Sequence, residues 1–91
     1  MLITFESKAK KTLDVLPLKH RRQIENRIFE LRDSPIPCGS KKLLGKEGYR
    51  RIKAGEYRII YRYEEINSLI VVVLIGKRNG DDVYRIARRV L

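Results

Sequence analysis

Seven consecutive apolar residues, Leu69 to Ile75, place the strongest constraint on how this chain can fold. The run is rich in β-branched residues, is too short to cross a membrane, and has apolar side chains at both odd and even positions. A strand of this kind is typical of the interior of a sheet that is covered on both faces. With 91 residues, the chain has room for one such domain, which is expected to span residues 1–91.

The chain before residue 35 has mainly helical periodicity. Residues 2–5 predict an opening strand, and residues 7–16 predict a helix that Ser7 caps. Pro17 suits the first turn of a second helix, which must end before Pro35. Almost nothing separates the two helices, so they are expected to form an antiparallel hairpin. Their apolar stripes contain Ala9, Leu13, Leu16, Ile24, Ile28 and Leu31.

After residue 48 the hydrophobic period changes from 3.6 to 2. A tight turn at Ala54-Gly55-Glu56 joins two predicted strands, and a second turn at Asn67-Ser68 leads into the apolar strand. Residues 81–91 predict a helix, with a short strand and a tail as the alternative. The order is β-α-α-β-β-β-α. It predicts an α+β fold in which the helical hairpin packs on one face of a small antiparallel sheet.

The charge of the chain is the first clue to its partners. Twenty-one Lys and Arg against eleven Asp and Glu give a formal net charge of +10. Between Lys41 and Arg62, eight basic and two acidic residues give +6. Such an excess favours nucleic acid, an anionic membrane or an acidic protein as partner, and a solvated basic face is the alternative. The single cysteine, Cys38, cannot form an internal disulfide, and the N-terminal residues lack the pattern of a signal peptide. The expected location is therefore the cytoplasm.

A group of basic side chains is expected to meet in one groove. Arg51 and Lys53 lie on one face of the first predicted strand, and Arg58 lies on its hairpin partner. Arg78 and Tyr84 follow the apolar strand. Several cations around one concavity repel each other, and a bound phosphate would relieve that repulsion. The pattern therefore favours a site for a phosphodiester.

The same residues suit metal-independent cleavage of RNA, in which the 2′-hydroxyl is the nucleophile. Such a reaction needs a base, positive charge for the phosphorane, and an acid for the departing 5′-oxygen. A lysine among cations has a lowered pKa, so Lys53 is a candidate base. Arg58 and Arg78 suit the transition state, and Tyr84 suits base stacking or proton transfer. One His and one Cys predict no metal site, and the sequence contains no Ser-His-Asp set, P-loop or Rossmann fingerprint that would call for a cofactor.

Three segments, in the same order and spacing, carry a family resemblance: SPIPCGSKKLLGK (34–46), RRIKAGEYRIIY (50–61) and LIGKRNGDDVYR (74–85). With the helical opening, they resemble the RelE branch of the RelE/ParE toxin superfamily. The resemblance implies a toxin that cleaves mRNA in the ribosomal A site and is neutralised by a cognate antitoxin protein.

The resemblance also assigns residues. By similarity, the catalytic positions are Arg51, Lys53, Arg58, Arg78 and Tyr84. The remaining basic residues nearby are expected to bind RNA or the ribosome: Lys41, Lys42, Lys46, Arg50, Lys77 and Arg85. This chain has Lys77 where many relatives have histidine, and it lacks the Glu–His pair of other branches. The identities of the general base and acid therefore stay open.

Other interpretations of the same residues are available. Arg51 and Lys53 suit a solvated strand face, Arg58 a structural salt bridge, and Tyr84 ordinary packing. At the level of function, a ParE-like gyrase poison needs a protein-binding surface on the same fold. A non-catalytic RNA- or ribosome-binding module predicts salt-dependent binding without cleavage.

Overall fold

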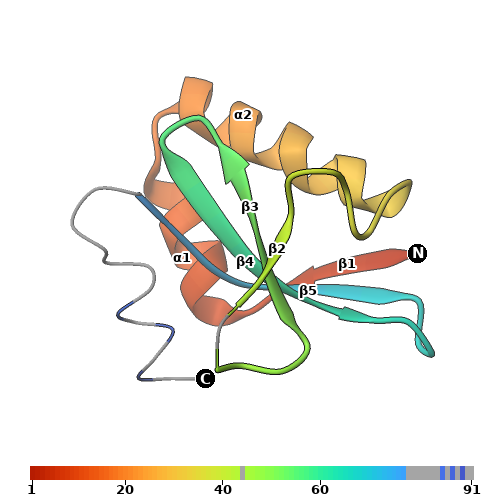
Figure 1. Ribbon diagram of the computed structural model, residues 1–91. Coiled ribbons are helices and arrows are strands. Elements are labelled where there is room, and N and C mark those ends of the chain that lie inside the picture. The colour runs from red at the N-terminus through yellow and green to blue at the C-terminus, as the bar shows by residue number, and fades with distance from the viewer. Residues whose placement is uncertain (44, 78–84, 86, 88, 90–91) are drawn as a thin grey trace.

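The computed structural model describes residues 1–43, 45–77, 85, 87 and 89. Within them, five strands form one sheet, in the spatial order β1-β5-β4-β3-β2 (Figure 1). The strands are β1 (Leu2–Phe5), β2 (Lys41–Lys42), β3 (Tyr49–Ala54), β4 (Tyr57–Glu64) and β5 (Leu69–Lys77). The apolar run Leu69–Ile75 lies in β5, between two neighbouring strands, as its composition predicts.

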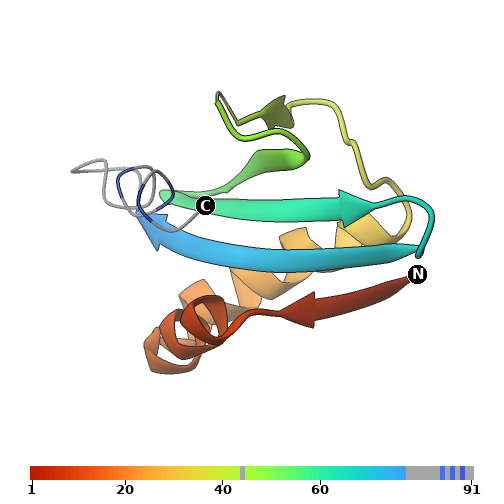
Figure 2. The same cartoon turned by 90° about the horizontal axis from the view of Figure 1, so that it is seen from below.

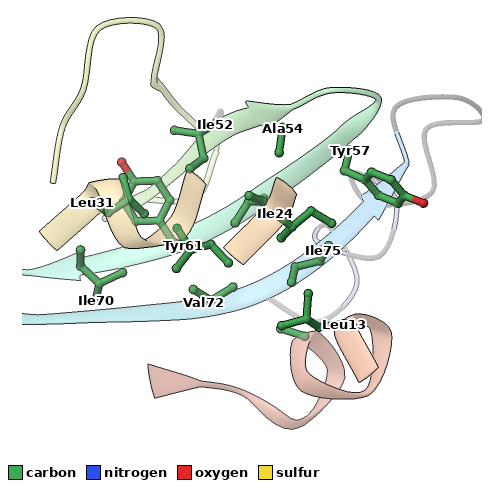
Figure 3. Close-up of a cluster of buried hydrophobic side chains, with 13 residues drawn as sticks. Leu13, Ile24, Leu31, Ile52, Ala54, Tyr57, Tyr61, Ile70, Val72 and Ile75 are labelled. Carbon is green, nitrogen blue, oxygen red and sulfur yellow. The ribbon is translucent and has the colours of Figure 1, made fainter. Parts of the chain in front are cut away.

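Helices α1 (Ser7–Val15) and α2 (Leu18–Phe29) pack on one face of the sheet (Figures 1 and 3). A short 3-10 helix, η1 (Glu30–Arg32), continues α2 up to the turn before Pro35. The observed starts of the two helices differ by one residue from the predicted ones. Ser7 is the first helical residue instead of the cap, and Pro17 occupies the cap position of α2.

The pairing of β1 corrects one part of the predicted fold. The pairs β2–β3, β3–β4 and β4–β5 are antiparallel, but β1 runs parallel to β5, with Leu2 opposite Leu69 (Figure 2). The sheet is therefore mixed. Parallel neighbours need a long crossover, and the chain between β1 and β5 includes both helices and the hairpin. The α+β class, with helices on one face, is confirmed.

Two apolar clusters cover the two faces of the sheet. The larger lies between the sheet and the helices, where Ile24, Ile28 and Leu31 are fully buried against strand residues such as Tyr61 and Val72 (Figure 3). The smaller, on the opposite face, contains Ile60, Val71, Val73, Leu74 and Ala87. The run in β5 thus contributes to both clusters, which explains its apolar side chains at successive positions.

The C-terminal segment contributes to the smaller cluster. Arg85, Ala87 and Arg89 are helical, which agrees with the predicted helix, and the buried Ala87 packs in the smaller cluster. In the ranges that the structure describes, no helix has both the length and the apolar character needed to cross a bilayer.

Candidate functional site

A pocket near the turn of the β3–β4 hairpin gathers several of the predicted site residues. Among the described residues, its lining consists of Gly39, Lys41, Arg51, Ile52, Lys53 and Arg58. Strand register explains the convergence, because Lys41 pairs with Arg51, and Lys53 pairs with Arg58. Cross-strand partners project from the same face of a sheet, so the cations of these two pairs share one side.

Two features of the sequence build this pocket. Gly55, at φ +61, begins the two-residue connection between β3 and β4, where a positive φ suits glycine. The connection sets the register that brings Lys53 opposite Arg58. Strand β2 lies within a segment rich in Pro, Gly, Ser and Lys, and it brings Lys41 to the edge of β3. The sequence predicts no strand there, since two residues carry no recognisable period.

Arg58 is the most unusual member of the pocket. Its side chain is buried, with 6% of the residue exposed. One terminal nitrogen, Nη1, donates to the carbonyl oxygens of Gly55 at 3.1 Å and Tyr57 at 3.0 Å. No carboxylate in the described part of the chain forms an ion pair with it. A buried charge without a counter-charge costs folding free energy, and an anion bound in the pocket would offset that cost.

Arg62 shows the opposite arrangement on the same strand. Its Nε donates to Glu64 at 2.9 Å, and its guanidinium lies 3.9 Å from the Glu6 carboxylate. It also donates to the Tyr49 hydroxyl, and this hydrogen bond together with the Glu64 contact raises the pKa of Arg62. The charge of Arg62 is therefore balanced by carboxylates, whereas among the described residues Arg58 has hydrogen bonds to carbonyl oxygens and no ion pair.

Three of the predicted RNA-binding residues lie in a second pocket. Lys42, Lys46 and Arg50 line it together with Tyr49 and Tyr63, among others. Successive residues of a strand point to opposite faces, so Lys42 and Arg50 project away from the side that carries Lys41 and Arg51. The predicted RNA-binding set is therefore divided between two surfaces.

Arg50 also has a structural role beside this second pocket. Its Nη2 donates to the Ser40 hydroxyl at 3.0 Å, while its Nε is buried without a hydrogen-bond partner. Its cross-strand partner, Tyr61, donates to the carbonyl oxygen of Pro35 at 2.6 Å. Burial raises the pKa of Tyr61, and the nearby Arg50 charge opposes that shift. These contacts hold the segment after η1 against the sheet.

The remaining predicted residues belong to the end of β5 and the C-terminal segment. Lys77 ends β5, where it pairs with Tyr57, and is exposed; Arg85 is helical and exposed. Arg78 and Tyr84 lie outside the described residues. Within the described ranges, no group of three His, Cys, Asp or Glu side chains is arranged as metal ligands would be.

Comparison with known proteins decides the family. Residues 3–82 match the family described as the ParE toxin of type II toxin–antitoxin (parDE) systems. A RelE-like toxin protein of Escherichia coli is 32% identical over 88 residues, which cover 93% of this chain and 90% of that protein. The chain belongs to the RelE/ParE toxin family. The toxin is of the RelE type, as the three sequence segments imply.

Solved structures agree with this assignment of the toxin. The isolated E. coli RelE toxin superposes with a TM-score of 0.76 and 27% identity, covering 99% of this chain and 98% of that one. RelE in the intact E. coli RelBE toxin–antitoxin complex superposes with a TM-score of 0.73 and 26% identity, covering 86% of this chain and 96% of that one. An archaeal RelE–RelB complex from Pyrococcus horikoshii, at 24% identity, shares the fold with a TM-score of 0.74. The match covers 86% of this chain and 94% of that one.

Proposed function

We propose that this toxin is a metal-independent endoribonuclease that cleaves mRNA in the ribosomal A site. The observation that carries the proposal is the pocket in which the buried Arg58, without an ion pair to any described carboxylate, lies with Lys41, Arg51 and Lys53. Two of these cations, Lys53 and Arg58, face each other across the strand pair, and a scissile phosphodiester would offset their repulsion. Membership of a toxin family supports a target inside the cell that produces it.

The proposed chemistry needs no nucleophile from the protein. The RNA 2′-oxygen attacks the adjacent phosphorus, the bond from phosphorus to the 5′-oxygen breaks, and a 2′,3′-cyclic phosphate and a 5′-hydroxyl result. Arg51 and Arg58 would stabilise the negative charge of the phosphorane. Lys53 would accept the proton of the 2′-hydroxyl, and Tyr84 would donate a proton to the departing 5′-oxygen or stack on a base. Arg78 is proposed as a further phosphorane contact on sequence grounds.

The other basic residues are proposed to bind RNA on either side of the reacting phosphate. Lys41 shares the pocket with the catalytic candidates, whereas Lys42, Lys46 and Arg50 lie beside Tyr49 and Tyr63 in the second pocket. Cations together with aromatic rings suit a single strand, whose phosphates and bases need both. Lys77 and Arg85 are proposed to contact mRNA or ribosomal RNA.

A cognate antitoxin is the proposed protein partner. RelE proteins of E. coli and P. horikoshii have been solved in complex with RelB. For this toxin, an acidic or amphipathic segment laid over the cationic pocket would mask it from RNA. Toxicity on expression is then expected only when the neighbouring antitoxin gene is absent.

Primer extension on translated mRNA tests the nuclease proposal. We expect new 5′ ends within codons for the wild-type toxin, and their loss in Arg58→Ala, Arg78→Ala and Tyr84→Phe. Arg22→Ala is the matched control, because Arg22 is an exposed arginine of α2 away from the pocket lining. Salt-dependent binding of RNA with no cleavage would overturn the proposal in favour of a non-catalytic binding module.

A gyrase poison is the second candidate, because the matching family is described by its ParE member. That activity needs a protein-binding surface and gives no reason for a buried arginine that has no ion pair among the described residues. DNA breaks and a DNA-damage response with intact mRNA would favour this candidate over the nuclease.

A further inference from the structure

One stripe of α2 contacts the hairpin that carries the candidate catalytic residues. His20, Gln23 and Arg27 follow one another at helical spacing on the same side of α2. The His20 ring lies 5.5 Å from that of Tyr57, and Arg27 hydrogen-bonds to the backbone of Lys53. Gln23 packs against the turn so closely that a Cβ on Gly55 would lie 2.7 Å from its Nε2. Behind the pocket, α2 therefore contacts both hairpin strands and their turn.

The contact of Arg27 is the most directional of the three. Its Nε donates to the carbonyl oxygen of Lys53 at 3.1 Å, and its Nη1 pairs with the Glu30 carboxylate at 2.9 Å. Only 23% of its side chain is exposed. Two bonds from different nitrogens of one planar group fix the guanidinium in a single orientation.

Strand pairing explains why Lys53 needs such a contact. In the described part of the chain, β2 pairs with Arg50 and Arg51 only, so no strand lies beside β3 at Lys53. On its other side Lys53 faces Arg58, and like charges directly opposite each other destabilise a strand pair. An unpaired edge under repulsion opens easily. The bond from Arg27 holds this part of β3 from behind.

We propose that Arg27, oriented by Glu30, is a positioning residue of the nuclease site, because it fixes the backbone from which Lys53 reaches the scissile RNA. The inference rests on the proposed function. Arg27 acts through Lys53 and does not touch RNA, since its own charge is paired with Glu30. A proton acceptor displaced by about 1 Å from its productive place costs on the order of a hundredfold in rate.

Single-turnover cleavage of mRNA on programmed ribosomes tests this role. For Arg27→Ala and Arg27→Lys we expect the cleavage rate at saturation to fall at least about tenfold, with KM changed less than about twofold. Lysine keeps the charge but cannot bond to Lys53 and Glu30 at once in the same geometry. Glu30→Ala should give a smaller loss of the same kind, and Arg22→Ala should behave as wild type.

The pattern among the variants decides the outcome. Full activity in Arg27→Lys, or a loss confined to KM in Arg27→Ala, would overturn the proposal, because either result means that Arg27 acts by its charge on RNA. Urea denaturation of each variant identifies any general loss of folding. A rate loss in Arg27→Ala that persists at a temperature where the variant is fully folded supports positioning.

A second measurement separates this inference from the proposed function. Amide hydrogen exchange of the full chain should become faster at Lys53 to Arg58 in Arg27→Ala and stay unchanged in β1 and β5. If wild-type toxin cleaves no RNA, the nuclease proposal fails, while the exchange data still report whether Arg27 holds the hairpin. Unchanged exchange in the hairpin would overturn the positioning role whatever the activity.

Discussion

Lys53 and Arg58 are direct partners across the β3–β4 hairpin, one exposed and one buried, on the face that forms the cationic pocket. Like charges in this position weaken a strand pair. The repulsion between these two cations opposes their pairing, and the proposed binding of a phosphate in the pocket would offset it. Such a conflict between local stability and the fold is expected at functional sites.

The first prediction concerns this pair. Lys53→Glu replaces repulsion with attraction, so the free energy of unfolding should rise by roughly 0.5 kcal/mol, while mRNA cleavage should be lost. Urea denaturation measures the first effect and primer extension the second. Lys53→Gln should give a smaller gain. The gain should shrink in about 1 M salt, which screens exposed charges; a gain independent of salt would contradict an electrostatic origin.

The second prediction compares the two arginines of β4. Arg58→Met keeps the length of the side chain and removes a buried charge, so the free energy of unfolding should change by less than about 1 kcal/mol. Cleavage should fall at least about a hundredfold, because a transition-state contact is lost. Arg62→Met removes two carboxylate contacts and should cost about 1–2 kcal/mol.

The comparison of these two variants also tests the interpretation of Arg58. If Arg58→Met destabilises the protein as much as Arg62→Met, then Arg58 is a structural residue that stabilises the hairpin through its hydrogen bonds to the carbonyls of Gly55 and Tyr57. Denaturation curves of both variants, recorded side by side, decide between these interpretations.

Features of the site that depend on local sequence patterns were predicted, whereas contacts between distant segments were not. Period-2 alternation and the turn at Gly55 were enough to predict that Arg51, Lys53 and Arg58 meet. Alternation also places Arg50 and Arg51 on opposite faces of the sheet. The sequence could not show that β2 adds a lysine to each face, because the pairing of Lys42 with Arg50 and of Lys41 with Arg51 depends on a two-residue strand. The parallel pairing of β1 with β5 and the bond from Arg27 to Lys53 join distant segments, and no local period records such contacts.

The third prediction concerns acid stability. The Glu64 carboxylate accepts hydrogen bonds from Asn67 at 2.8 Å and from Arg62 at 2.9 Å, and these bonds lower the pKa of Glu64. Glu64 thus adds stability above its unfolded pKa, near 4.5, and this is lost as the pH falls through the lower folded value. Glu64→Gln should therefore unfold with a weaker dependence on pH below about pH 5.

The matched control for this acid effect is Glu65→Gln. Glu65 is the exposed neighbour of Glu64, and its carboxylate forms none of the hydrogen bonds found among the described side chains. Its replacement should leave the pH dependence as in wild type. Equal slopes for wild type and Glu64→Gln in urea titrations at several pH values would show that the Glu64 contacts do not persist in solution.

The last prediction concerns alkaline stability. The fully buried Tyr61 donates to the Pro35 carbonyl, and burial raises its pKa. Because the folded pKa exceeds the unfolded value near 10, its contribution is complete below about pH 10 and is lost as the pH rises through the folded pKa. Tyr61→Phe should cost about 1 kcal/mol at neutral pH, and this deficit should shrink above about pH 10. Tyr63→Phe, at a half-buried position, is the control for measurements of unfolding between neutral and alkaline pH. A constant deficit in Tyr61→Phe would mean that the hydroxyl has the same pKa in the folded and unfolded states, which would contradict the effect of burial.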